Sequence, residues 1–143
     1  MKKLTLLIAA AIFAVMTLTG CEPDRESSGW LKGTTWKAIL DEDNGDGSIK
    51  IHFTQNGYRL NIDARYNKVR AITRFFPDYE YPTLYFPISW DEEDGKPVNV
   101  IYNIGTISED LKTIHFDSFR DRGYTIGSFS GYNEYKDIAF IRQ

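Results

Sequence analysis

The chain has 143 residues, a formal net charge of −3 and one cysteine. This length suits one domain with a hydrophobic core of its own. The mildly acidic balance argues against a protein that coats phosphate backbones, so we expect no nucleic-acid partner. A single cysteine excludes a disulfide within the chain, so side-chain packing must hold the fold together.

The N-terminus has the features of a secretory signal. Two lysines follow the initiator methionine, and an apolar run from Leu4 to Leu18 comes next. This order of a charged start and an apolar region is typical of a signal peptide, and the run is shorter than the roughly 20 residues of a membrane-spanning helix. We predict a cleaved leader over 1–20. The leader ends at a group of four residues: Leu18, Thr19, Gly20 and Cys21.

These four residues resemble the lipobox of bacterial lipoproteins, in which an aliphatic residue, a small residue and Gly or Ala precede a cysteine. The resemblance implies cleavage before Cys21, a diacylglycerol group on its sulfur and a further acyl chain, such as palmitate, on the freed amine. Two or more acyl chains anchor a protein stably in a membrane. The membrane is therefore an expected partner through the lipid. Acylation consumes the sulfur, so Cys21 is not expected to act as a nucleophile.

The residues after the cysteine bear on location and organisation. Glu22 stands where Asp would signal retention in the inner membrane, so the resemblance implies a cell-envelope protein of the outer membrane, with the periplasmic or surface face left open. We predict that residues 21–29 form the lipid-bearing cysteine and a flexible tether, because 22–29 contain no apolar side chain. Residues 30–143 then form a single domain.

Alternating apolar and polar residues predict short strands in the domain. The clearest pattern covers 58–66, and the Asn56-Gly57 pair before it is a strong hairpin signal. Pro87 predicts an edge, a bulge or a break in its strand. The expected strands are 34–40, 49–54, 58–66, 69–76, 83–90, 98–104, 113–116 and 138–142. Turns are expected at 41–47, 91–95 and 108–110, a tyrosine-rich connection at 77–82, and no assigned strand over 119–135.

About eight sequential strands predict an all-β antiparallel meander. Closure into a small barrel would remove its exposed edges, so a barrel is the expected architecture. Aromatic residues make up 15% of the chain, which also favours strands over helices.

The segment 31–36, with its Gly33 and Trp36, followed by 51–53 and the Asn56-Gly57 turn, resembles small lipocalin-like lipoproteins of Bacteroides-type bacteria. The resemblance implies a calycin-type barrel in which Arg142 packs on Trp36 as a cation–π pair. The Gly-x-x-Trp spacing is one residue longer than the lipocalin pattern. The implied function is a non-enzymatic binding protein for a small apolar molecule or a glycan of unknown identity. A protein-interaction module, either an inhibitor or a subunit of an envelope complex, is the alternative.

No pattern in the chain indicates a catalytic site, a metal site or a cofactor. His52 and His115 lack metal-ligand spacing, and a calcium-loop register through 42–53 ends on Phe53 where a bidentate Glu is needed. No nucleophile elbow accompanies the serines. Aromatic rings in an exposed connection are the remaining candidates for ligand stacking, namely Tyr79, Tyr81 and Tyr85.

Overall fold

The computed structural model describes residues 24–125 and 128–143. The predicted all-β class is confirmed, because the described residues form one short 3-10 helix and nine strands. The elements are η1 (Ser28–Leu31), β1 (Thr35–Leu40), β2 (Gly47–Phe53), β3 (Tyr58–Ala64), β4 (Asn67–Thr73), β5 (Asp78–Glu80), β6 (Thr83–Glu93), β7 (Lys96–Ile107), β8 (Thr113–Thr125) and β9 (Ser128–Arg142).

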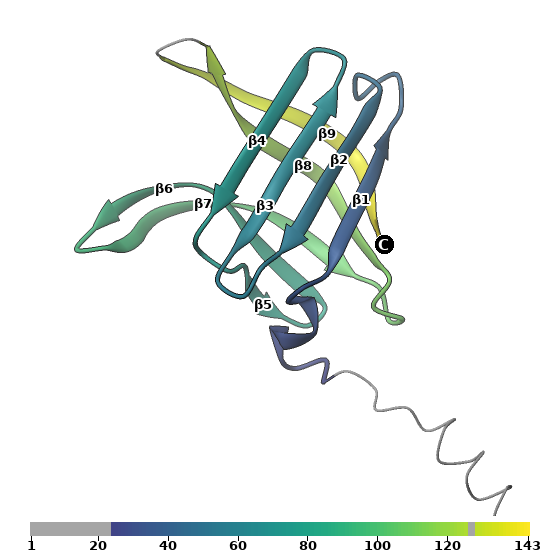
Figure 1. Ribbon diagram of the computed structural model, residues 1–143, viewed down its shortest axis with the longest axis vertical. Helices are drawn as coiled ribbons and strands as arrows, with labels where there is room; N and C mark the ends of the chain where they lie inside the picture. The colour runs from purple at the N-terminus through teal and green to yellow at the C-terminus, as the bar shows by residue number, and fades with distance from the viewer. Residues whose placement is uncertain (1–23, 126–127) are drawn as a thin grey trace, which may run out of the picture.

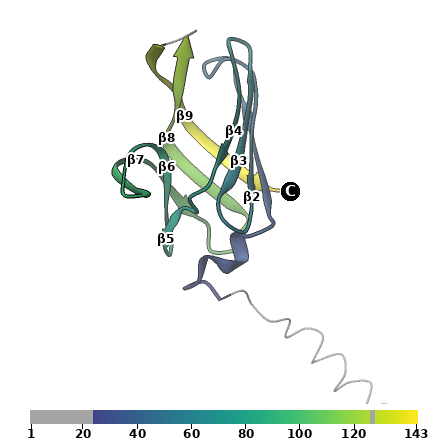
Figure 2. The same ribbon diagram turned by 60° about the vertical axis from the view of Figure 1, so that its left-hand side comes forward.

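All nine strands belong to one antiparallel sheet in the order β4-β3-β2-β1-β9-β8-β7-β6-β5. Two meanders, β1 to β4 and β5 to β9, join where Trp36 and Lys37 of β1 pair with Arg142 and Ile141 of β9. The sheet curls into a half-barrel with β1 to β4 as one wall and β6 to β9 opposite (Figures 1 and 2). The two end strands, β4 and β5, follow each other in sequence but are not hydrogen-bonded neighbours.

The clearest sequence pattern is confirmed over Tyr58–Ala64 together with its hairpin, but the strand ends two residues before the predicted limit and Tyr66 is exposed. Every second residue of β3 is buried, and the strand begins directly after Gly57. The Thr54 amide donates to the Gly57 carbonyl at 2.9 Å. A Cβ atom on Gly57 would lie 1.9 Å from the carbonyl oxygen of Thr73 at the end of β4. Only glycine therefore allows this hairpin to pack beside β4.

Pro87 marks an irregularity in β6, as predicted. The pairing of β6 with β7 shifts register on both sides of Ser89. The strand then runs on to Glu93, beyond the expected end, and turns at Asp94 and Gly95. Both turn residues have positive φ (52° and 73°), the pattern of a type I′ hairpin. The tip of this β6–β7 hairpin projects away from the sheet (Figure 1).

Two segments differ from the expectation. The connection 77–82 contains the short strand β5, and the unassigned segment 119–135 belongs to a long hairpin of β8 and β9. The pairs in this hairpin include Phe119 with Tyr135 and Gly123 with Gly131. Glycines weaken the strand signal in a sequence, whereas a paired ladder tolerates them when they lie opposite each other.

Phenylalanine rings fill the space between the two walls. Between ring centroids, Phe86 on β6 lies 5.8 Å from Phe53 on β2, in the opposite wall, and 6.2 Å from Phe119 on β8. Phe116 and Phe140 each contact Phe119, at 5.2 and 5.4 Å. All five side chains are at most 1% exposed. Such ring pairs stabilise a core by about 0.5–1.5 kcal/mol each beyond the area they bury.

Removing one of these rings tests whether the interior is a packed core. Phe119→Ala should lower the free energy of unfolding by about 3–5 kcal/mol, because the neighbouring rings cannot close the space that it leaves. Urea unfolding measures this loss. Phe76→Ala is the matched control: its ring is only partly buried and should cost clearly less. A loss for Phe119→Ala no larger than that of the control would contradict a tightly packed interior.

Candidate functional site

Two of the three candidate tyrosines hold the N-terminal segment. The Tyr79 hydroxyl donates to the Arg25 carbonyl at 2.5 Å and accepts from the Trp30 indole at 3.3 Å. The Arg25 guanidinium lies 5.8 Å from the ring centroid of Tyr81. Tyr85 instead makes an edge contact with Tyr102 at 6.1 Å. The three rings do not form one stacking platform, and the second half of the expected tether packs against the domain.

Trp36 and Arg142 face each other across the β1–β9 ladder. The Trp36 indole is fully buried, donates to the Thr34 hydroxyl at 2.7 Å and meets the Trp30 ring edge-on at 6.1 Å. Arg142 is exposed. The two residues are thus paired through the backbone, but the expected cation–π contact is wrong: the cation–π pairs of the described residues are Arg25 with Tyr81, Lys32 with Phe76 and Arg65 with Tyr66. The ring that packs on Trp36 is Trp30.

The two histidines lie on different strands and have separate partners. His52 on β2 shares a 2.8 Å hydrogen bond with the Thr35 hydroxyl. His115 on β8 contacts Asp137 at 2.6 Å and Asp117 at 3.6 Å, and its side chain is 41% exposed. Within the described ranges, no three His, Cys, Asp or Glu side chains gather as ligands of a metal ion.

The acidic turn before β2 has structural partners. Asp41 accepts from the backbone and side-chain nitrogens of Asn44 at 3.0 and 2.9 Å. Asn44 also exchanges two hydrogen bonds with the backbone of Lys136 on β9. Asp46 forms an ion pair with Arg65 at 2.6 Å. These contacts fix the turn between the two walls.

The leader, the four-residue motif and Cys21 lie outside the described residues. In the part of the chain that is described, no helix is long and apolar enough to span a bilayer.

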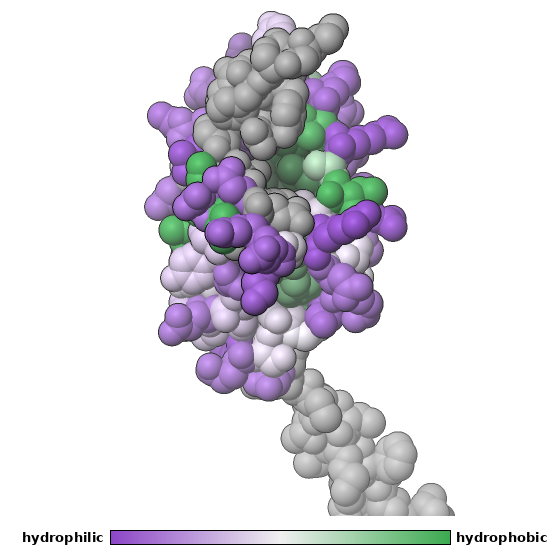
Figure 3. All heavy atoms as spheres, turned by 90° about the vertical axis from the view of Figure 1, so that its left-hand side faces the viewer, coloured by the Kyte–Doolittle hydropathy of each residue, from purple (hydrophilic) through white to green (hydrophobic). Residues whose placement is uncertain are grey.

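The half-barrel has one open side, next to β4. On β6, only Thr83 to Tyr85 pair with β5, and the described remainder of that edge has no strand beside it. The outer edge of β4 also has no partner among the described strands. The inward residues Val69 and Ala71 of β4 are consequently only half-buried, unlike their counterparts on β2 and β3. Figure 3 looks onto this side and shows apolar side chains in a hollow with hydrophilic rims.

A polar cluster crosses the interior behind this open side. The Asn67 amide of β4 donates to Asp121 Oδ2 on β8 and to the Tyr135 hydroxyl on β9, both at 2.6 Å. Asp121 is 2% exposed, and its Oδ1 atom has no hydrogen-bond partner among the described residues. Burial raises the pKa of the Asp121 carboxyl, while the side chains of Asn67 and Asn133 oppose the rise. The sequence alone does not single out this acid, because it lies within 119–135, where no strand pattern is clear.

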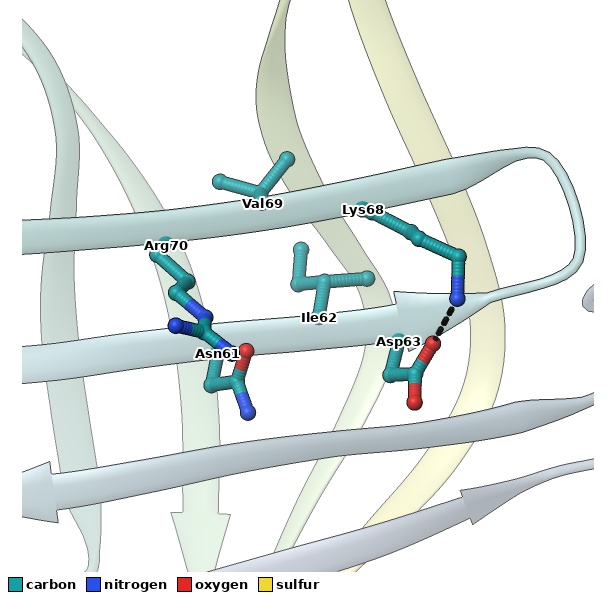
Figure 4. Close-up of a pocket in the computed structure, with 6 residues that line it drawn as sticks. All are labelled: Asn61, Ile62, Asp63, Lys68, Val69 and Arg70. Atoms are coloured by element: carbon teal, nitrogen blue, oxygen red, sulfur yellow. Dashed lines mark hydrogen bonds and ion pairs between the residues drawn. The ribbon is translucent and has the colours of Figure 1, made fainter.

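The outer face of β3 and β4 carries a shallow hollow of about 400 Å³. Two cross-strand pairs flank it: Asn61 with Arg70, and Asp63 with Lys68. The Lys68 ammonium lies 2.5 Å from Asp63 and lowers the pKa of that carboxyl. In Figure 4 these four side chains point to the outer side of the sheet and Ile62 and Val69 to the inner side. The hollow is thus a polar surface feature, separate from the core.

Comparison with family models, curated proteins and solved structures finds no match to this chain.

The buried carboxyl predicts a pH-dependent difference in stability. Its pKa is raised in the folded state, so the protein loses stability as the pH rises from the ordinary Asp pKa to the raised one, and the full loss is present above the raised pKa. Asp121→Asn keeps an acceptor for Asn67 and removes the charge. At pH 7 we expect the variant to be more stable than the wild type by about 1 kcal/mol, and we expect the gain to vanish towards pH 4 as Asp121 becomes protonated.

Urea unfolding across this pH range measures the difference between the two proteins. Asp43→Asn, at an exposed position, is the control and should show no such trend. A gain that stays constant with pH would contradict the raised pKa.

Proposed function

We propose that this protein is a lipid-anchored binding protein of the cell envelope. We further propose that it has no enzymatic activity and that it binds an extended segment of a partner protein along β4. The carrying observation is the unpaired edge of β4 on the open side of the half-barrel. This is the interaction-module alternative of the sequence analysis, and it takes precedence over an internal small-molecule site because phenylalanine rings occupy the interior.

The anchor is supported by the order of features at the N-terminus. A charged start, an apolar run and Leu18-Thr19-Gly20-Cys21 follow one another at the spacing of a lipoprotein leader. The chain is held by a strand of the domain only four residues after Cys21, where Tyr79 of β5 binds the Arg25 carbonyl. Four extended residues span at most about 14 Å. The lipid would therefore hold the domain close to the bilayer. Because Glu22, and not Asp, follows the cysteine, we propose the outer membrane as the location.

An unpaired strand edge offers backbone donors and acceptors to an added strand. Small apolar side chains suit the half-buried positions beside Val69 and Ala71. Outward residues of the added strand would lie beside Lys68 and Arg70, and acidic side chains are favourable there. The same two cations disfavour antiparallel pairing of β4 with a second copy of itself. The chemistry of the edge thus favours a strand that alternates apolar and acidic residues.

The histidine positions are consistent with a binding role. His52 and His115 lie on strands of opposite walls and each has a local partner, so they do not converge on one reacting group. The Asp121 cluster is buried and is held by Asn67.

Lipid attachment is tested by metabolic labelling with an alkynyl palmitate. The wild-type chain should incorporate the label and sediment with membranes, whereas Cys21→Ser should do neither, because the hydroxyl does not replace the sulfur as acyl acceptor. Thr19→Ser keeps a small residue in the motif and should be labelled like the wild type. Label that persists in Cys21→Ser would exclude this anchor.

Strand addition is tested with two synthetic peptides of equal length, one alternating Val with Glu and the other alternating Val with Lys. The Val–Glu peptide should bind and should slow hydrogen exchange of β4 amides, while amides of the central strand β1 stay unchanged. In the double variant Lys68→Glu/Arg70→Glu the preference should reverse, by at least about threefold in Kd, because each cross-strand charge pair contributes roughly 0.2–1 kcal/mol.

Lys96→Glu/Lys112→Glu is the matched control, since it makes the same charge change away from β4 and should keep the wild-type preference. Equal binding of both peptides, or protection that spares β4, would refute strand addition at this edge.

A further inference from the structure

The outward side of β1 to β4 is basic although the chain as a whole is acidic. Alternation along four strands places five cations and one acid on this face, a net charge of +4, against −3 for the whole chain. The cations are Lys37, Lys50, Arg59, Lys68 and Arg70, and the acid is Asp63. They are far apart in sequence and become neighbours only through strand pairing.

The registers place part of this charge in one row across the sheet. Lys37 lies directly opposite Lys50, Lys50 opposite Asn61, and Asn61 opposite Arg70. With strands about 4.8 Å apart, the row is roughly 14 Å long. Like charges directly opposite each other destabilise a sheet. Lys68 forms an ion pair with Asp63, and Arg70 also acts electrostatically on that carboxyl, whereas the salt bridges of the described residues include none of Lys37, Lys50 and Arg59. An anionic partner would offset this repulsion.

Exposed isoleucines stand among these cations. Ile39 of β1 is 72% exposed and Ile72 of β4 is 78% exposed. Ile72 lies opposite Arg59, and Ile141 of β9, 48% exposed, lies opposite Lys37. Cations mixed with large apolar side chains match the interface of a bilayer, where headgroups carry charge and acyl chains begin just below them. A soluble acidic polymer would give these isoleucines nothing apolar to contact.

We propose that the outer face of β1 to β4, with its cations and isoleucines, binds the anionic headgroups of the membrane to which the chain is anchored. The inference rests on the proposed lipid anchor for its setting. The N-terminal segment, bound through Arg25 to Tyr79, lies at the end of the sheet where β1 begins (Figures 1 and 2). A link of at most about 14 Å from Cys21 keeps this face within reach of the bilayer. The domain then lies on the membrane by one defined face.

Vesicle sedimentation of the chain without its acyl anchor tests binding by the outer face of β1 to β4 alone. The unacylated chain 22–143, which contains every described residue, should bind vesicles of equimolar phosphatidylglycerol and phosphatidylcholine, and bind vesicles of phosphatidylcholine alone at least tenfold more weakly. Binding should weaken steeply with added salt. Lys37→Gln/Lys50→Gln should lower the partition coefficient about 25-fold, because each cation near an anionic surface contributes about fivefold.

Three further variants make the test specific. Lys96→Gln/Lys112→Gln makes the same charge change outside the face and should alter binding less than about twofold. Arg59→Gln/Arg70→Gln should lower the partition coefficient by a similar factor. This variant replaces Lys37→Gln/Lys50→Gln if urea unfolding shows that the latter does not fold. Ile72→Ser should weaken vesicle binding severalfold through loss of apolar contact alone.

Equal binding to both vesicle types, or equal losses in the face and control variants, would overturn the proposal. The proposal would also be overturned if soluble polygalacturonate bound tightly, competed with vesicles and bound the Ile72→Ser variant equally well. The partner would then be an acidic polymer. Palmitate labelling of Cys21 is measured separately. If the full-length protein is labelled but the unacylated chain does not bind vesicles, headgroup binding by the outer face is refuted, while lipid attachment at Cys21 is supported.

Discussion

The phenylalanine rings between the two walls are the constraint on which the rest of this structure depends. Phe86 on β6 contacts Phe53 of the β1–β4 wall and Phe119 of its own wall, and all three rings are fully buried. A nine-stranded sheet of this curvature encloses a limited space, and aromatic side chains use it for packing. The chain has no intramolecular disulfide to replace that packing. Binding is thereby directed to strand edges and outer faces, and the interior serves stability.

The open side follows from how β6 and β7 leave the wall. The register shifts around Ser89 bend β6 after Pro87, while the Tyr58 hydroxyl binds the Pro87 carbonyl and holds the base of the strand. Burial raises the pKa of Tyr58 to about 12, so this hydroxyl remains a donor at neutral pH. On β7, the buried Asn103 amide exchanges two hydrogen bonds with the backbone of Arg120 beyond the short β7–β8 ladder. The hairpin swings outward from these fixed points, and the outer edge of β4 has no neighbour among the described strands.

Local signals made much of the fold predictable. The alternation in β3, the Asn56-Gly57 turn and the irregularity at Pro87 depend on residues close in sequence, and all three are confirmed. The β8–β9 hairpin was missed because its support is cross-strand pairing, which no single segment reveals. The roles of Tyr79 and Tyr81 were missed because their partner, Arg25, lies more than fifty residues away. The basic face of β1 to β4 was also not predicted, because strand registers assemble it from single cations that are far apart in the sequence.

The two proposed surfaces share Lys68 and Arg70 on β4, and otherwise they are distinct, because one is a face and the other an edge. Lys37 and Lys50 point outward from the sheet, whereas the free backbone groups of β4 lie in its plane. A bilayer against the outer face would leave that edge open sideways, parallel to the membrane. A lipid anchor fixes distance but not orientation, and a charged face supplies the second constraint. Together they would present β4 in a constant orientation to an extended segment of a neighbouring envelope protein.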